Sequence, residues 1–212
     1  MKKIEVRNVS KTIQGQKVLS QINLILEGGN VYGVHGYNGS GKTMLFRMIS
    51  GLIKPTEGTV LIDGEQLHKD IDFPRSIGVL IENPSFWENY TGKEVLKTLA
   101  KIQNKVGDKE ISEAMNRVGL NPDDSRVVKK YSLGMRQKLG IAQAIMEKPD
   151  ILILDEPTNA LDEGSVKLVH EIIREEKARG SIVVICSHNK ADIEDLSDYK
   201  IKMESGKIIE RG

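Results

Sequence analysis

The sequence contains one cysteine and few aromatic residues, and it has no long apolar run. Aromatic side chains make up 4% of the 212 residues, and Cys186 is the single thiol, so no internal disulfide can form. Cys186 lies in the apolar run SIVVIC, which predicts a small buried hydrophobic side chain in a reducing cytosol. No stretch approaches the roughly 18 apolar residues that a membrane-spanning helix needs. We therefore expect any action at a membrane to require a partner.

The chain also lacks an excess of charge of either sign. Lysine and arginine number 31 against 30 acidic residues, so the formal net charge is +1. This balance provides no electrostatic footprint for nucleic acid, and we expect no nucleic-acid partner. The first residues, MKKIEVRNVSK, alternate apolar and polar side chains without the apolar core of a signal peptide. We expect a cytoplasmic protein.

The apolar patterns predict an α/β core. Short or alternating apolar runs predict strands in KIEVRNV, INLIL, NVYGVHG and GTVLIDGEQL, and a further strand, SIGVLIE, that ends at Glu82. The runs ILILDE and SIVVIC are continuously apolar, which indicates strands covered on both faces, as in a central parallel sheet. The segment KTMLFRMISGL and residues 164–179 predict helices of this core.

Three consecutive helical patterns interrupt the core. The first begins with the capping box Thr91-x-x-Glu94, the second with Asp108 as N-cap, and the third with Ser132 as N-cap. These patterns predict an inserted helical subdomain over residues 84–148. The core then comprises the two flanking segments, 1–83 and 149–212.

The segment GYNGSGKT has the pattern of a phosphate-binding P-loop. It follows the strand VYGVH and opens a helix, as this motif requires. Glycines let backbone N–H groups point at phosphate oxygens, Lys42 supplies a positive charge, and the Thr43 hydroxyl can hold Mg²⁺. Eight matched positions in this context favour a P-loop over an ordinary glycine-rich turn, so we expect a nucleoside triphosphate site. Its residues are Gly36, Tyr37, Asn38, Gly39, Ser40, Gly41, Lys42 and Thr43.

Two adjacent carboxylates end the strand ILILD. Asp155, at the tip of a central strand, is placed to hold the Mg²⁺ of a nucleotide. Glu156, the next residue, can orient or deprotonate the attacking water, a role that typically contributes about 10²–10⁴-fold. Taken alone, Glu156 can equally be a solvated acid at a strand end.

Together with their surroundings, these residues closely resemble the ATP-binding subunits of ABC transporters over essentially the whole chain. The family has a catalytic glutamate and a proline after its metal-binding aspartate, as in Asp155-Glu156-Pro157. TNALD resembles the family's D-loop, which implies that Asp162 reaches toward a subunit interface. SHNKADIE places His188 where the family has a histidine that contacts the γ-phosphate.

The segment YSLGMRQKLGIAQAI resembles the signature motif of the family. Ser132 and Gly134 occupy the positions that face the γ-phosphate of an ATP held by a second subunit. The usual leucine, first glycine and closing glutamine of the motif are replaced by Tyr131, Leu133 and Met135. Without the resemblance, the segment is an ordinary capped amphipathic helix.

Two further departures from the family are informative. Ile13 stands where family members stack the adenine ring on an aromatic side chain. Glu82 replaces a glutamine that lies near the bound Mg²⁺, so we count it among the nucleotide and metal contacts. The sequence Glu82-Asn83-Pro84 resembles a bacterial subgroup associated with bacitracin and lantibiotic resistance.

The resemblance implies a P-loop NTPase core with a mostly parallel central sheet, an N-terminal antiparallel β subdomain and the inserted helical subdomain. It implies an ATP-hydrolysing subunit that uses ATP and Mg²⁺ and forms an ATP-dependent dimer with a second ATP-binding subunit, which we expect to be an identical copy. It also implies that this dimer drives a separately encoded transmembrane permease. Such a subunit lies peripherally on the inner face of the cell membrane. The subgroup implies export of an antimicrobial peptide or other amphipathic compound.

ABC ATPases also include classes that do not act in transport. The DNA-repair class needs a long coiled-coil insertion, but Lys42 and Asp155 are only 113 positions apart. The ribosome-associated class normally carries two such domains in one chain. A nucleotide-dependent sensor that does not hydrolyse is disfavoured by the catalytic residues named above. A role in iron–sulfur assembly or cell division stays open.

Overall fold

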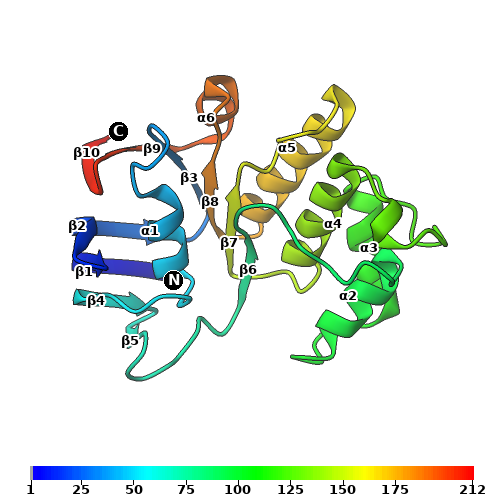
Figure 1. Cartoon of the computed structure of the whole chain (residues 1–212), viewed down its shortest axis with the longest axis horizontal. Coiled ribbons are helices and arrows are strands. Elements are labelled where there is room, and N and C mark those ends of the chain that lie inside the picture. The colour runs from blue at the N-terminus through cyan, green and yellow to red at the C-terminus, as the bar shows by residue number, and fades with distance from the viewer. Residues whose placement is uncertain (1) are drawn as a thin grey trace.

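The computed structural model describes residues 2–212, and its elements follow the predicted α/β order (Figure 1). Within this part of the chain the strands are β1 (Lys3–Ile13), β2 (Gln16–Glu27), β3 (Asn30–His35), β4 (Glu57–Ile62), β5 (Glu65–Gln66), β6 (Ile77–Leu80), β7 (Ile151–Asp155), β8 (Ile182–Cys186), β9 (Tyr199–Glu204) and β10 (Lys207–Arg211). The α-helices are α1 (Lys42–Ile49), α2 (Gly92–Ala100), α3 (Asp108–Arg117), α4 (Leu133–Ile145), α5 (Glu163–Ala178) and α6 (Lys190–Leu196). Across residues 2–212 no helix is long and apolar enough to cross a membrane.

The strands form two sheets. The antiparallel sheet has the order β2-β1-β4-β5, which confirms the predicted N-terminal β subdomain. The central sheet has the order β10-β9-β3-β8-β7-β6. Its strands are parallel except for β10, which pairs antiparallel with β9 at one edge. The prediction of a mostly parallel central sheet is confirmed.

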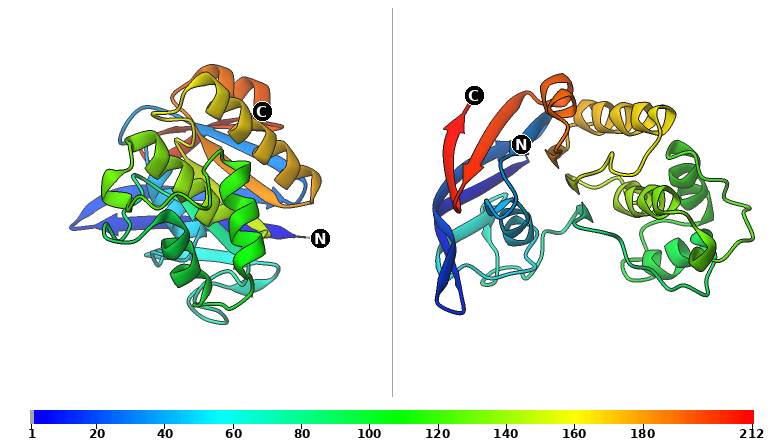
Figure 2. Two further views of the ribbon diagram at one scale, coloured as in Figure 1. Left: turned by 90° about the vertical axis from the view of Figure 1, so that its right-hand side faces the viewer. Right: turned by 45° about the horizontal axis from the view of Figure 1, so that its top comes forward.

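Both faces of the central sheet are covered. Every residue of β7 and β8 is buried, as their continuous apolar runs predict. Helix α1 packs between one face of this sheet and the antiparallel sheet, where Phe46 is fully buried. Helices α4, α5 and α6 contribute buried residues to the cluster on the other face. The antiparallel sheet and helices α2–α4 therefore lie at opposite ends of the molecule (Figures 1 and 2).

Two of the three inserted helices have the predicted N-cap residue, and the third does not. Thr91 forms its capping box at α2, and Ser132 caps α4 by accepting a hydrogen bond from the backbone of Met135. The N-cap of α3 is Gly107, so the prediction of Asp108 was wrong. The Glu110 carboxylate accepts the Gly107 N–H at 2.9 Å, so the helix begins at Asp108, one residue earlier than it would with Asp108 as its N-cap. The boundaries of the helical subdomain at 84 and 148 stay a prediction.

Glycine on each side lets α4 lie against β6. A Cβ at Gly78 would lie 1.8 Å from the carbonyl oxygen of Ala144, and a Cβ at Gly140 would lie 2.8 Å from a methyl group of Leu80. At Gly78 any other residue would require movement of the backbone, and at Gly140 it would require at least a shift of the Leu80 side chain. This close packing places the N-terminal half of α4 beside the end of β7.

Candidate active site

Three loops meet where parallel strands of the central sheet end. The P-loop follows β3, Asp155 and Glu156 lie at the end of β7, and His188 follows β8. Because β3, β8 and β7 are neighbours and run parallel, their carboxyl ends share one edge of the sheet. These loops line a cleft of about 710 Å³. The predicted site residues that line it are Asn38, Gly39, Ser40, Gly41, Lys42, Thr43, Glu82, Asp155, Glu156 and His188.

The P-loop wraps around the ammonium group of Lys42. Its Nζ donates hydrogen bonds to the carbonyl oxygens of Gly36 at 2.8 Å and Tyr37 at 3.1 Å, and the side chain is buried. Gly39 and Gly41 have φ angles of 79° and 104°, which glycine adopts without strain. Lys42 is therefore held inside the loop, at the floor of the cleft. Gly36 and Tyr37 line a different cavity behind the loop.

Thr43 and Asp155 form an oxygen pair at the start of α1. The Thr43 hydroxyl donates a hydrogen bond of 3.1 Å to Oδ2 of Asp155. Asp155 is 7% exposed, and its burial raises the pKa of its carboxyl group, while the Thr43 hydrogen bond opposes that shift. A buried carboxylate beside a hydroxyl is an all-oxygen donor set, which suits Mg²⁺.

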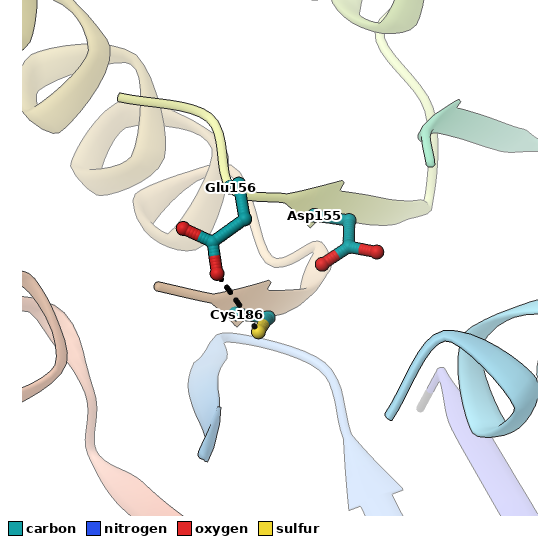
Figure 3. A group of neighbouring side chains, drawn as sticks. All are labelled: Asp155, Glu156 and Cys186. Carbon is teal, nitrogen blue, oxygen red and sulfur yellow. Dashed lines mark hydrogen bonds between the residues drawn. The ribbon is translucent and has the colours of Figure 1, made fainter. Parts of the chain in front are cut away.

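Glu156 is held on the β8 side by two residues. The His188 backbone N–H donates to Oε2 at 3.0 Å, and the Cys186 thiol donates to Oε1 at 3.5 Å. Burial raises the pKa of the Cys186 thiol, which therefore stays protonated and donates. Figure 3 shows the three side chains Asp155, Glu156 and Cys186 converging from the ends of β7 and β8. The buried position of Cys186 confirms the sequence prediction, but its hydrogen bond to Glu156 was not predicted.

The histidine ring also approaches the glutamate. Nε2 of His188 lies 3.4 Å from Oε1 of Glu156, and the ring is largely exposed to the cleft. The structure thus brings Lys42, Asp155, Glu156 and His188 to one cleft, from three loops far apart in the sequence.

Gln137 is a cleft residue that the sequence did not predict. Gln137, on α4, donates from Nε2 to the backbone carbonyl of Glu156 at 2.8 Å. Its side chain is buried and lines the cleft. A glutamine within a helical pattern has no local feature that distinguishes it, so only the fold reveals this contact.

The strand before Glu82 is shorter than predicted. β6 ends at Leu80, and Glu82 adopts a left-handed φ of 59°, so the prediction that the strand ends at Glu82 was wrong. A left-handed residue breaks the extended backbone that strand pairing needs. The Glu82 carboxylate forms an ion pair of 2.8 Å with Arg47 of α1. It lines the cleft, but its negative charge is directed to that arginine.

Besides Gly36 and Tyr37, three predicted site residues lie outside the cleft. Ser132 caps α4, as described above, and its neighbour Gly134 packs against the segment after Glu156, because a Cβ there would lie 2.7 Å from the carbonyl oxygen of Ala160. Asp162 caps α5 by accepting the Ser165 N–H at 2.8 Å. The role predicted for Ser132, Gly134 and Asp162 requires a second subunit and stays a prediction.

The structure has no aromatic side chain at Ile13, the position where the family stacks the adenine ring. Ile13 is 38% exposed at the end of β1 and is not among the residues that line the cleft. The rim of the cleft on this side is formed by Gln16, Lys17 and Val18. How adenine is held stays open at this rim.

Comparison with known proteins agrees with this geometry. The sequence profile of the family described as "ABC transporter" matches residues 19–159. The ABC transporter ATP-binding protein YybJ of Bacillus subtilis is 52% identical, over 97% of this chain and 94% of that protein. The bacitracin transport ATP-binding protein BcrA of Bacillus licheniformis is 39% identical, over 98% of this chain and 68% of that protein. The lantibiotic transport ATP-binding protein SrtF of Streptococcus pyogenes is 35% identical, over 97% and 89%.

A solved structure shares the whole fold. The structure described as the ATP-binding subunit of an ABC transporter superposes with a TM-score of 0.89 at 26% identity. The match covers 99% of this chain and 89% of that chain.

Proposed function

The chain belongs to the ABC transporter family as an ATP-binding subunit with ATPase activity, and from this premise we propose that it powers export of an antimicrobial peptide or similar amphipathic compound. One observation carries the catalytic part: the Glu156 carboxylate lies in the cleft between the P-loop and His188, held by defined hydrogen bonds. The export part is supported by the likeness to the bacitracin and lantibiotic transport proteins.

The P-loop binds the phosphates. Lys42 now donates to two carbonyl oxygens of its own loop, and phosphate oxygens are stronger acceptors for an ammonium group. ATP binding therefore redirects Lys42 from Gly36 and Tyr37 toward the nucleotide. The N-terminus of α1 adds its partial positive charge at the same place.

Mg²⁺ fits the pair formed by Thr43 and Asp155. Both donors are oxygen atoms, and burial keeps the pKa of the Asp155 carboxyl raised although the Thr43 hydroxyl, the Cys186 thiol and the Lys42 ammonium favour its charged form, so a cation there would stabilise the carboxylate. We propose that Thr43 and Asp155 hold the ion, with Glu82 nearby on the cleft wall. When bound, Mg²⁺ neutralises negative charge on the phosphates.

Glu156 acts on the attacking water. Its carboxylate accepts hydrogen bonds from His188 and Cys186 on one side, which leaves acceptor capacity for a water molecule in the cleft. The water oxygen attacks the γ-phosphorus, Glu156 takes the proton, and the bond to the oxygen of ADP breaks. The His188 ring, exposed to the cleft, is placed to contact the γ-phosphate.

We propose a dimer of two identical subunits as the working form. Ser132 and Gly134 lie outside their own chain's cleft, so they serve a nucleotide only if a second subunit presents one. Leu133 between them is 57% exposed, and an interface would bury this apolar side chain. Asp162, which caps α5, lies in the segment that contacts Gly134.

The permease is proposed to dock beside the helical subdomain. Trp87 and Tyr90 lie between β6 and α2, are 49% and 45% exposed, and have ring centroids 6.1 Å apart. An exposed aromatic pair suits the core of a protein–protein interface. Docking there places the chain peripherally on the inner face of the membrane, close to Glu82 and the cleft.

Co-purification and reconstitution test this proposal. A tagged chain, extracted with detergent from cells, should bring down an integral membrane protein. In vesicles, the ATPase activity of that complex should rise several-fold on addition of bacitracin or a lantibiotic. Trp87→Ala should keep the ATPase activity of the isolated subunit while losing the stimulation. Recovery of soluble iron–sulfur or cell-division proteins in place of a membrane protein would contradict the transport function.

A further inference from the structure

Asp192, in the first turn of α6, is a buried carboxylate that collects four hydrogen bonds. Its Oδ2 accepts from the hydroxyls of Thr158 at 2.7 Å and Ser187 at 2.9 Å. Its Oδ1 lies 3.1 Å from Nε2 of His170 and 3.4 Å from the amide of Asn189. Because a carboxylate only accepts, the His170 nitrogen that faces it carries a proton. Asp192 is 3% exposed, so these partners replace its hydration.

The donors join the two loops that flank the catalytic glutamate. Thr158 lies two residues after Glu156, and Ser187 immediately precedes His188. The Ser187 hydroxyl also accepts the Asn189 N–H at 3.1 Å, so both sides of His188 are tied to the same group. His170 anchors Asp192 to helix α5, which is part of the rigid core. Asp192 thus links the Glu156 loop, the His188 loop and the core.

Packing does not fix the position of His188. The active-site cleft lies on one side of it, and a second cavity of about 540 Å³, lined also by Tyr37 and Lys202, lies on the other. The His188 side chain is 60% exposed. A residue with open space on both sides depends on hydrogen bonds for its placement. The bonds that Asp192 makes to its neighbours are therefore the restraint that matters.

We propose that Asp192 is a positioning residue for ATP hydrolysis: it sets the placement of His188 relative to Glu156 by fixing Thr158 and Ser187 to one carboxylate. This inference rests on the ATPase activity, and it assigns a part in hydrolysis to a residue outside the cleft. A buried, fully hydrogen-bonded polar network costs more than an apolar contact of the same size, and its benefit is a unique geometry. Here that geometry is the 3.0 Å bond from the His188 N–H to Glu156.

The first test is Asp192→Asn in the assembled transporter or the purified subunit. The amide has the size of the carboxylate, but its NH₂ group is a donor. Whichever way the amide is turned, this group faces donors: either the Thr158 and Ser187 hydroxyls, or His170 and Asn189. We expect kcat to fall by at least about tenfold, while KM and the calorimetric Kd for ATP change by less than about threefold. Loss of kcat and of ATP affinity in parallel would overturn the proposal, because it would indicate general damage to the fold.

The second test uses the two loop donors. Thr158→Val and Ser187→Ala each break one arm of the link, so each should lower kcat, and the double variant should be no slower than the slower single variant. Thr98→Val, which removes a hydroxyl on α2 outside the cleft and outside this network, is the matched control and should stay within about twofold of wild type. Additive effects of Thr158→Val and Ser187→Ala would show that the two hydroxyls act independently, and the link would be disproved.

A readout without hydrolysis separates this inference from the proposed function. In Asp192→Asn, the amide hydrogen of His188 should exchange with solvent faster than in wild type, while amides of β7 and β8 keep their protection. An unchanged exchange rate at His188 would overturn the inference even if the wild-type chain hydrolyses ATP. A wild-type complex without ATPase activity would instead contradict the proposed function, and the exchange measurement would still decide the role of Asp192.

Discussion

The side chain of Gln137 holds the backbone of Glu156 through a hydrogen bond of 2.8 Å to its carbonyl oxygen. Glu156 has a left-handed φ of 52°, a conformation that is uncommon for a residue with a side chain. The donor belongs to α4, the helix that Ser132 caps and that packs closely on β6. A movement of this helix relative to the sheet therefore reaches Glu156, the proposed general base, directly through one hydrogen bond.

Replacing the donor at Gln137 should slow hydrolysis without weakening ATP binding. Gln137→Met keeps the length of the side chain but cannot donate, so the turn at Glu156 loses its support. We expect kcat to fall by about tenfold or more, measured by phosphate release, with the Kd for ATP unchanged within threefold. Gln143→Met, the same change further along α4, is the control and should behave as wild type. Equal activity of both variants would rule out this role for Gln137.

Removal of the P-loop charge should act on binding. Lys42→Ala deletes the ammonium group that the loop encloses, and truncating a buried charged partner costs roughly 2–5 kcal/mol. The Kd for ATP should then rise by about thirtyfold or more in calorimetry. Lys54→Ala removes an equal charge outside the cleft and should leave affinity unchanged. Normal ATP binding by Lys42→Ala would refute the P-loop assignment.

Neutralising the proposed base should separate binding from turnover. Glu156→Gln should bind ATP with Mg²⁺ normally, yet hydrolyse it at least about tenfold more slowly. The uncleaved ATP should hold two subunits together, which size-exclusion chromatography with and without ATP detects. A variant that stays active and monomeric would assign the base role elsewhere, with His188 as the first alternative.

Glu82→Gln should leave ATP affinity nearly unchanged. The carboxylate is paired with Arg47 and is 60% exposed, so its loss removes one solvent-screened ion pair and no ground-state nucleotide contact. We expect the Kd for ATP to change by a few-fold at most, while transport by the reconstituted complex is altered. A fall in affinity as large as that of Lys42→Ala would make Glu82 a direct ligand of the bound nucleotide.

Two substitutions of Asp162 separate its capping role from its proposed interface role. Hydrogen bonds from the Ser165 N–H and hydroxyl lower the pKa of the Asp162 carboxyl in the folded protein. The stabilisation by this cap is therefore fully present above the pKa of Asp162 in the unfolded chain, and it is lost as the pH falls through its pKa in the folded protein. Asp162→Asn keeps a good N-cap, whereas Asp162→Ala removes it. Thermal unfolding at pH 7 should therefore show a lower Tm for Asp162→Ala only. If the Asp162 charge acts between subunits, each of the two substitutions, combined with Glu156→Gln, should weaken the ATP-dependent dimer in size-exclusion chromatography.

The sequence predicted what short segments encode. The P-loop, the acidic pair and the buried strands β7 and β8 each depend on fewer than about ten consecutive residues, so local chemistry and periodicity were sufficient. Competition between neighbouring groups explains the errors: the Glu110 carboxylate selected Gly107 as the N-cap, and the left-handed backbone at Glu82 ended β6 early.

Contacts between distant segments had no such signal. Gln137 reaches the backbone of a residue 19 positions away, and Thr158 meets Asp192 across 34 positions. Each side chain alone is an ordinary polar residue in a helix or loop. Their roles depend on the order of strands β3, β8 and β7, which periodicity cannot provide.

The place of β3 in the central sheet also has a consequence for synthesis. The strand that carries the P-loop pairs with β8 and β9, both of which are translated near the end of the described chain. While the ribosome is still producing the helical insertion, β3 has neither neighbour, although all strands of the antiparallel sheet, two before β3 and two after it, have already been translated. A nascent chain that stops before Ile182 should therefore be unable to retain ATP, and exposed β3 is the segment on which chaperones would act.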